Sequence, residues 1–358
     1  MAGAMAGALA GCAAPDERPP PALTEHALAA LIAELPLEDA AGVVVAVGDI
    51  ADCDRLEQAH ATAVIAAAVL AAAPDGLVIT LGDHAYPDGT RAELERCYGP
   101  TWGALNRVTY PSPGNHDFET ENGAPYFAYF AYYAREPTAR ERGYYAFERF
   151  GWRFVSLSSL LPLGRGSEQL AWLEAELARA ASDCTLAYWH HPLTSSGWHG
   201  LSPWDAGRDT ADAWSVLMAF GAELVVNGHE HFYERFEPQT PDLEPDPHGI
   251  RQIIAGTGGA ELMPAVRSRR NSAFVHEGLG VLVLSLRPGA YQWAFVGVEG
   301  RILDRSPAPV PCHGPPGATA RSVAYRPGGA PTSAGLGASM PSPAGSSPGA
   351  TASPRFTW

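Results

Sequence analysis

Positive charge is scarce in this chain of 358 residues, which has 24 lysines and arginines against 39 aspartates and glutamates and a net charge of −15. A groove that binds nucleic acid is lined with cations, so the composition argues against a nucleic-acid partner. An acidic protein can still bind phosphate where a local feature, such as a metal ion, overrides the global field.

Other absences narrow the class of protein further. No stretch is apolar for the roughly 18 residues of a transmembrane helix without glycine, proline or charge, and no repeat of solenoid period is present. No pair of cysteines has CxxC spacing, which argues against a zinc knuckle. The hydrophobic fraction of 46% is ample for the core of one large or two ordinary domains.

The N-terminal sequence MAGAMAGALAGCAAP contains Leu9-Ala10-Gly11-Cys12, which resembles the lipobox of bacterial lipoproteins. We therefore expect residues 1–12 to be a signal peptide ending at a lipidated Cys12, and an extracytoplasmic protein that is lipid-anchored to the membrane or secreted. No lysine or arginine precedes the apolar stretch, unlike an ordinary signal peptide, so a frayed Ala/Gly-rich terminus is the alternative. An exported protein can form disulfides, and Cys53, Cys97, Cys184 and Cys312 allow three pairings.

The rest of the chain divides by composition. We expect a tether and a short helix over residues 13–41, a catalytic domain over 42–305, and a disordered tail rich in Pro, Gly, Ala and Ser over 306–358. Within 42–305, apolar runs alternate with helical patterns at 54–73, 167–180 and 210–220. Residues 143–159 predict a hairpin that turns at Phe150-Gly151. This alternation, followed by three strand-like runs without helices, predicts an α/β fold with a mixed sheet.

Polar side chains recur at the carboxyl ends of the apolar runs. In open α/β sheets these ends meet at one edge, where ligands bind. Each motif alone is weak, because a lone GD after a strand is usually a turn. The set is Asp49, Asp83, Asn115 with His116, His190, and His229 with His231 in NGHEH. In an extended chain, residues two apart point to the same side, so the last two histidines can reach two neighbouring metal ions.

Together and in this order, GD (48–49), GDHAY (82–86), GNHD (114–117), a strand ending in His190, and GHEH (228–231) resemble the calcineurin-like metallophosphoesterases. The resemblance is greatest to the purple acid phosphatases, here in a single-domain form, and implies mixed β-sheets packed as a central sandwich flanked by helices. It implies two metal ions. Asp49, Tyr86 and His231 would hold the first, Asn115, His190 and His229 the second, and Asp83 would bridge both, while His116 would contact phosphate.

Tyr86 decides the branch of the family. Most metallophosphoesterases have Asp-x-His in the first block, but this chain has Ala51 at the histidine position. Tyr86 can fill the vacancy, and a phenolate is a hard ligand that favours Fe(III). We therefore expect Fe(III) at the Tyr86 site and Zn, Fe(II) or Mn at the second.

The resemblance implies hydrolysis of phosphomonoesters by a metal-bound hydroxide. His116 and His199 are the expected catalytic histidines, which with Asn115 would contact the small phosphorylated substrate. The alternatives are a phosphodiesterase, nucleotidase or pyrophosphatase with the same site, or a non-catalytic surface-anchored binding protein. Metallo-β-lactamases read HxHxDH, which Phe232 and Tyr233 contradict.

Several other polar residues receive lesser roles. We expect His191 to point away from His190, and Asp117 to orient His116 or cap a helix. Residues 233–235 would support the ligand loop. The remaining motif-free histidines are expected at the surface: His26, His60, His248 and His276.

Overall fold

Two seven-stranded β-sheets form the framework of the computed structural model, which describes residues 22–73, 75–133, 142–179, 184–201 and 208–314. The first sheet has the order β15-β14-β13-β1-β3-β5, with β16 beside β14. Its strands β1, β3 and β5 are parallel, and β13 joins β1 antiparallel. The strands are β1 Gly42–Val47, β3 Gly76–Leu81, β5 Thr109–Ser112, β13 Gly280–Arg287, β14 Ala290–Gly297, β15 Arg301–Arg305 and β16 Val310–Pro311.

The second sheet has the order β12-β10-β11-β9-β8-β7-β6. Its central strands β7, β8, β9 and β11 are parallel, and both edges are antiparallel. The strands are β6 Tyr145–Arg149, β7 Trp152–Ser156, β8 Cys184–Tyr188, β9 Leu224–Asn227, β10 Tyr233–Phe236, β11 Arg251–Ala255 and β12 Ser272–His276. A short parallel pair, β2 Ala51–Asp52 and β4 Ala85–Tyr86, lies beyond the ends of β1 and β3.

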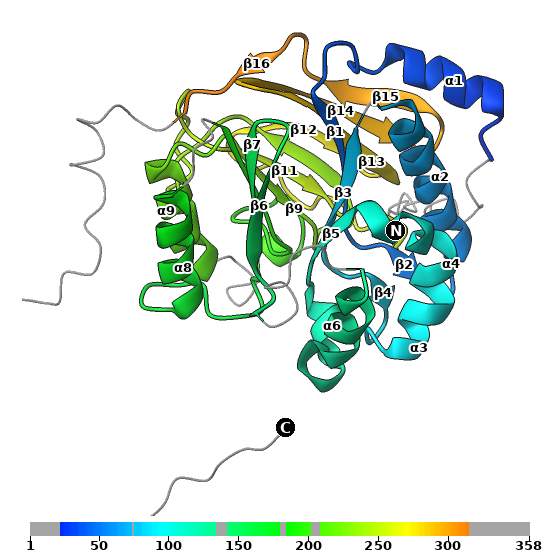
Figure 1. Ribbon diagram of the computed structural model, residues 1–358, viewed down its shortest axis with the longest axis horizontal. Helices are drawn as coiled ribbons and strands as arrows, with labels where there is room; N and C mark the ends of the chain where they lie inside the picture. The colour runs from blue at the N-terminus through cyan, green and yellow to red at the C-terminus, as the bar shows by residue number, and fades with distance from the viewer. Residues whose placement is uncertain (1–21, 74, 134–141, 180–183, 202–207, 315–358) are drawn as a thin grey trace, which may run out of the picture. The chain divides into compact units, whose positions relative to one another are not determined.

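Alternating side chains sort the two faces of each sheet. Val44 and Ala46 of β1 pack with Phe154, Leu186 and Val226 of the second sheet, so the inner core lies between the sheets. The intervening valines of β1 pack against α2 (Leu56–Ala72). Helices α8 (Glu168–Leu177) and α9 (Arg208–Ala219) cover the outer face of the second sheet. The expected sandwich of mixed sheets flanked by helices is therefore confirmed (Figure 1).

The other described helices lie before or between these elements along the chain. They are α1 Glu25–Glu34, α3 Arg91–Glu93, the π-helical turn η1 Leu94–Tyr98, α4 Gly99–Thr101, η2 Gly103–Val108, α5 Asn115–Glu119, η3 Glu121–Gly123, α6 Ala124–Ala131 and η4 His199–Leu201. The predicted hairpin is confirmed, with Phe150 and Gly151 at φ 56° and 77° in its turn. The helical pattern predicted at 167–180 is also confirmed, because α8 occupies Glu168–Leu177 and buries Leu170, Leu173 and Leu177.

Two disulfides resolve the pairing that the sequence left open. Cys53 bonds Cys97, and Cys184 at the start of β8 bonds Cys312. The expected end of the domain at residue 305 is therefore too early, because the chain continues through β16 to this second bridge. Cys12, the signal peptide and most of the expected tail lie outside the described residues. Among the helices that are described, none has the length and apolarity needed to cross a bilayer.

Candidate metal centre

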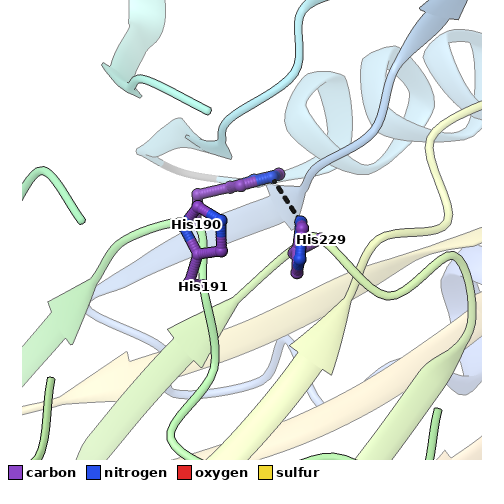
Figure 2. A group of neighbouring side chains, drawn as sticks. All are labelled: His190, His191 and His229. Atoms are coloured by element: carbon purple, nitrogen blue, oxygen red, sulfur yellow. Dashed lines mark hydrogen bonds between the residues drawn. The ribbon is translucent and has the colours of Figure 1, made fainter. Parts of the chain in front are cut away.

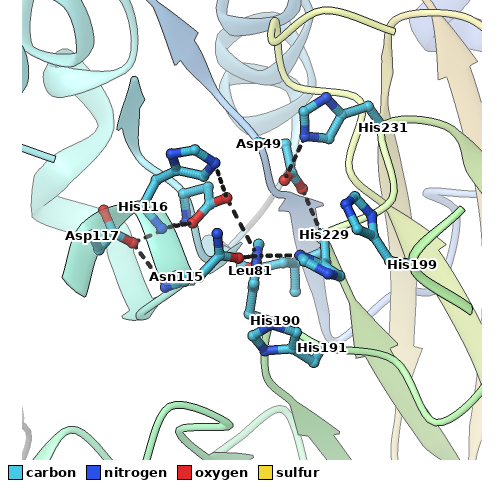
Figure 3. Close-up of polar contacts among 12 residues, drawn as sticks. Asp49, Leu81, Asn115, His116, Asp117, His190, His191, His199, His229 and His231 are labelled. Atoms are coloured by element: carbon cyan, nitrogen blue, oxygen red, sulfur yellow. Dashed lines mark hydrogen bonds and ion pairs between the residues drawn. The ribbon is translucent and has the colours of Figure 1, made fainter. Parts of the chain in front are cut away.

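The polar residues singled out in the sequence lie where strands of both sheets end (Figure 3). Asp49 and Asp83 follow β1 and β3 of the first sheet, and His190 and His229 follow β8 and β9 of the second. Three of these residues have left-handed backbone: Asp49 (φ 58°), Asp83 (φ 52°) and His229 (φ 73°). Such backbone is strained in residues other than glycine and concentrates at functional sites.

The Tyr86 phenol joins the first group of candidate ligands. Its oxygen lies 3.0 Å from Asp49 Oδ1, 3.1 Å from Asp83 Oδ2 and 3.2 Å from His231 Nε2. The His231 Nε2 atom is itself 3.2 Å from Asp49 Oδ1. The pairing of β2 with β4 sets Ala51 beside Ala85, so the chain brings Tyr86 next to the position that lacks a histidine.

A second group forms around the Nε2 atom of His190. It lies 2.9 Å from Asn115 Oδ1, 3.1 Å from His229 Nδ1 and 3.3 Å from Asp83 Oδ2 (Figure 2 shows the two imidazoles). Asp83 Oδ2 therefore contacts both groups, which is the place of a bridging ligand. The structure brings together all seven residues that the sequence suggested as ligands.

These groups suit cations because they hold more lone pairs than protons. One phenolic proton faces three acceptors, and the ligand atoms of Asp49, Asp83 and His190 all lie within 4.8 Å of one another. Burial and the charges of Asp49 and Asp83 raise the pKa of Tyr86 well above its ordinary value. Burial lowers the pKa of His190, but Asp83 outweighs it and raises that pKa to about 9. A proton on His190 thus balances charge that bound cations would balance instead.

Backbone carbonyls orient two of the imidazoles. His190 Nδ1 lies 2.7 Å from the Leu81 oxygen, and His231 Nδ1 lies 2.5 Å from the Glu261 oxygen. A carbonyl can only accept, so each Nδ1 carries the hydrogen and, in a neutral ring, Nε2 presents its lone pair to the site. This arrangement of an oriented histidine is typical of metal ligands.

His116 and His199 lie at the mouth of the site. The His116 backbone N–H donates to Asp83 Oδ1 at 2.9 Å, and its Nε2 is 4.0 Å from Asp83 Oδ2. His199 lies in η4 with its ring centroid 4.1 Å from that of His229. Both side chains keep about a third of their surface exposed, 33% and 29%. They can therefore reach a bound substrate.

The structure corrects the expectation for His191 and decides between the two roles expected for Asp117. His191 does not point away from the site, because its ring lies 4.2 Å from that of His229 and its Nδ1 is 2.8 Å from Ser159 Oγ. Burial and the neighbouring His190 lower its pKa to about 3. Of the two roles expected for Asp117, the structure supports the cap of α5, where Asp117 accepts from the Gly114 N–H at 2.8 Å, and not the orientation of His116. The expectation for His191 assumed an extended strand. Because β8 ends at Tyr188, residues 190–191 lie past the strand and the alternation of side chains does not apply to them.

Asp117 instead organises the loop that carries Asp83. It accepts from the backbone N–H groups of Asp83 (2.9 Å) and His84 (3.1 Å) and lies 2.9 Å from His84 Nδ1. His84 is fully buried, and its Nε2 lies 2.7 Å from Thr80 Oγ1. Sequence reasoning gave His84 no role, although its place directly after a candidate ligand was a usable signal.

Glu230 was also missed. It is fully buried between His229 and His231, where its Oε1 accepts from Ser195 Oγ at 2.6 Å and from the Gly200 N–H at 3.1 Å. Its Oε2 is 3.4 Å from His199 Nδ1. An acid at the centre of HxH points opposite to its neighbours, and that alternation was the available signal.

The support of the ligand loop expected from residues 233–235 stays a prediction, because their side chains contact other segments. Glu234 accepts from the backbone N–H and the hydroxyl of Ser196, at 2.9 and 2.6 Å, while Tyr233 and Arg235 both donate to Asp304. Of the motif-free histidines, His26, His60 and His248 are exposed as expected, and His276 is half-buried.

The model of the calcineurin-like phosphoesterase family matches residues 42–233, which span every ligand position above. The chain belongs to this family. Purple acid phosphatase 15 of Arabidopsis thaliana is 29% identical over 217 residues, covering 52% of this chain and 40% of the relative. Purple acid phosphatase 21 of the same plant is 27% identical over 228 residues, covering 56% and 50%. The chain thus spans half or less of the length of these curated relatives.

Among solved structures, a purple acid phosphatase from yellow lupin (Lupinus luteus) seeds superimposes with a TM-score of 0.62 at 20% identity, over 74% of this chain and 53% of that one. At this identity the likeness shows the fold alone. The candidate ligands of this calcineurin-like phosphoesterase are therefore assigned from the contacts of its own side chains and not from the superposition. The combination of Tyr86 with Ala51 is the feature by which those residues resemble the purple acid phosphatases.

Proposed function

We propose that this phosphoesterase is a dinuclear-metal phosphohydrolase that hydrolyses phosphomonoesters. The observation that carries the proposal is the Tyr86 phenol, placed within 3.2 Å of Asp49, Asp83 and His231 at once. A hard anionic oxygen set of this kind suits Fe(III). The imidazoles of His190 and His229 with Asn115 suit Zn, Fe(II) or Mn at the second position.

Bound metals would solve the electrostatic problem posed by an acidic protein. When bound, the two ions supply Lewis-acid charge and activate water as the nucleophile for in-line displacement. The five charges of an Fe(III)–M(II) pair exceed the three of Asp49, Asp83 and Tyr86 as anions. The surplus attracts a phosphate locally, despite the net charge of −15.

The chain's own residues would complete the chemistry. His116 is held by the Pro87 carbonyl, 2.5 Å from its Nδ1, and its Nε2 lies 4.0 Å from Asp83 Oδ2, where it could donate to a phosphate at the metals. Glu230 lies beside the Nδ1 of His199 and leaves Nε2 to donate a proton to the leaving oxygen. Asn115 can donate its amide N–H to phosphate while its oxygen faces the second metal position.

Metal analysis with a phosphatase assay tests this function. Purified protein should contain two metal ions, hydrolyse nitrophenyl phosphate and absorb visible light through phenolate-to-iron charge transfer. Tyr86→Phe should abolish the colour, whereas Tyr110→Phe, a control at a buried tyrosine stacked on Phe147, should keep it. An active, fully metallated enzyme that is colourless and free of iron would reject the iron assignment. A metal-free protein inactive on every phosphoester would favour the non-catalytic alternative.

We also propose an extracytoplasmic location with Cys12 as a lipid anchor, supported by the lipobox-like sequence before it. The two disulfides agree with an oxidising compartment. Wild-type protein should partition into detergent, and Cys12→Ser protein should not. Recovery of a cytoplasmic protein with residues 1–12 intact would refute the proposal.

A further inference from the structure

Two arginines converge on the loop that carries His199. Arg267 Nη2 donates to the Gly200 carbonyl at 2.8 Å. Arg269 donates to the same carbonyl and, through Nε, to the Ser195 carbonyl at 2.7 Å. Both guanidinium groups thus lie against the residues that flank His199.

Arg269 adjoins the metal centre. A small hollow is lined jointly by Arg269, Ser195, Gly200, His199 and His229, and the last of these is a candidate ligand. Because the ring centroids of His199 and His229 are only 4.1 Å apart, a group bound beside Arg269 would lie next to a phosphate held at the metals. Arg267 is exposed and Arg269 half-buried, so solvent reaches the pair.

No carboxylate of the described residues forms an ion pair with either arginine. By contrast, their neighbour Arg270 pairs with Glu244 at 2.7 Å, and Arg235 pairs with Asp304 at 2.7 Å. Among the described residues, the guanidinium groups of Arg267 and Arg269 contact carbonyl oxygens instead. Burial and then the charge of Arg267 lower the pKa of Arg269, whereas the carboxylates of Glu234 and Glu230 act in the opposite direction.

We propose that Arg267 and Arg269 form an anion subsite that binds a second phosphate of the substrate, beside the phosphate at the metal centre. The inference rests on the proposed phosphohydrolase function and narrows its substrate class to compounds with two phosphates, such as diphosphates or bisphosphates. A guanidinium has five N–H donors in a planar fork that fits phosphate oxygens. The contacts above use one donor of Arg267 and two of Arg269, which leaves donors for a ligand.

Competitive inhibition measures binding of the second phosphate separately from hydrolysis of the first. Methylenediphosphonate and methylphosphonate differ by one phosphonate group, and phosphonoacetate carries a carboxylate in its place. With nitrophenyl phosphate as substrate, the metallated full-length wild type should bind the diphosphonate more tightly than the other two. A hydrogen bond to a charged group is worth about tenfold to a hundredfold in affinity.

Arg267→Gln should reduce the preference for the diphosphonate over methylphosphonate by about tenfold. The matched control is Arg270→Gln, which removes the same charge three residues along the chain, where Glu244 holds it away from the site. Arg269→Gln should have the larger effect, although it also removes two contacts to the loop of His199. The exposed Arg267 therefore provides the decisive variant if Arg269→Gln proves unstable.

Three outcomes would overturn the subsite. One is an unchanged preference in Arg267→Gln, and another is an equal loss in Arg270→Gln, which would indicate only a general field. The third is equally tight binding of phosphonoacetate, which would indicate a site for any anion and not for phosphate. Failure of the proposed function looks different, because nitrophenyl phosphate hydrolysis and metal content would be missing from the wild type itself.

Discussion

Asp117 links the two loops that carry Asp83 and Asn115, so its replacement by asparagine tests how the site is held together. One carboxylate oxygen, Oδ2, accepts from the N–H groups of Asp83 and Gly114 and lies 2.9 Å from His84 Nδ1. The other, Oδ1, accepts from the His84 N–H at 3.1 Å. The side chain is fully buried, so water cannot replace a lost partner.

The size of the effect follows from these contacts. Asparagine can keep its oxygen at the crowded Oδ2 position, but its NH₂ group then faces the His84 N–H, donor against donor. A buried donor left without an acceptor costs about 1–3 kcal/mol, and the remaining bonds lose the strengthening that a charged acceptor gives. The lower desolvation cost of a neutral amide offsets part of this loss. We expect Asp117→Asn to lower the free energy of unfolding by about 2–4 kcal/mol.

Urea unfolding of the metal-free protein measures this change directly, and metal titration measures its consequence. Displacing the loops of Asp83 and Asn115 should weaken metal affinity by about tenfold to a hundredfold, the usual effect of changing a residue that supports ligands. Asp54→Asn, at an exposed position, is the control and should stay within about 0.5 kcal/mol of the wild type. A stability loss below about 1 kcal/mol with unchanged metal affinity would refute the reasoning, because four contacts would then carry no energy.

Three further predictions concern the site and its frame. Asp83→Ala removes the oxygen shared by both ligand groups and should abolish binding at both metal positions on elemental analysis; near-normal metal content would exclude the bridging role. His199→Ala should slow alkyl phosphates by about 10²–10⁴ and nitrophenyl phosphate much less, with Glu230→Gln weaker in the same direction, whereas equal losses on both substrates would indicate phosphate binding. The double variant Cys184→Ser, Cys312→Ser opens a loop of 128 residues and should lower unfolding stability by about 4–5 kcal/mol in denaturant titration, and an unchanged midpoint would contradict this.

Local patterns made much of the fold predictable from the sequence. The hairpin of β6 and β7 requires only alternating side chains and a turn at Phe150-Gly151, and all of that information lies within a few residues. The ligand positions were equally accessible, because polar residues such as Asp49 and His190 interrupt strongly apolar runs at strand ends. A polar residue that ends an apolar run can be recognised in the sequence without knowing how distant segments fold.

Contacts between distant segments were not predictable in the same way. Arg269 reaches the Ser195 carbonyl across 74 positions of sequence, and no periodicity encodes which loop it meets. The pairing of Cys184 with Cys312 likewise depends on where β16 brings the chain back beside β14. His191 belongs to the same class, since its direction depends on a turn beyond the end of β8.

The acidic surface and the candidate site act on a bound anion over different distances. At physiological ionic strength, charges separated by more than about 8 Å are largely screened in solvent, so most of the acidic surface contributes little at the site. At the site itself, His116 and His199 present donor groups beside the candidate metal positions, where bound cations would outweigh the charges of Asp49 and Asp83. All 24 cationic side chains of this chain are arginines, whose planar forks recognise phosphate geometry as well as its charge. An acidic protein can therefore bind an anion selectively, because short-range groups decide what is held while the distant carboxylates are screened.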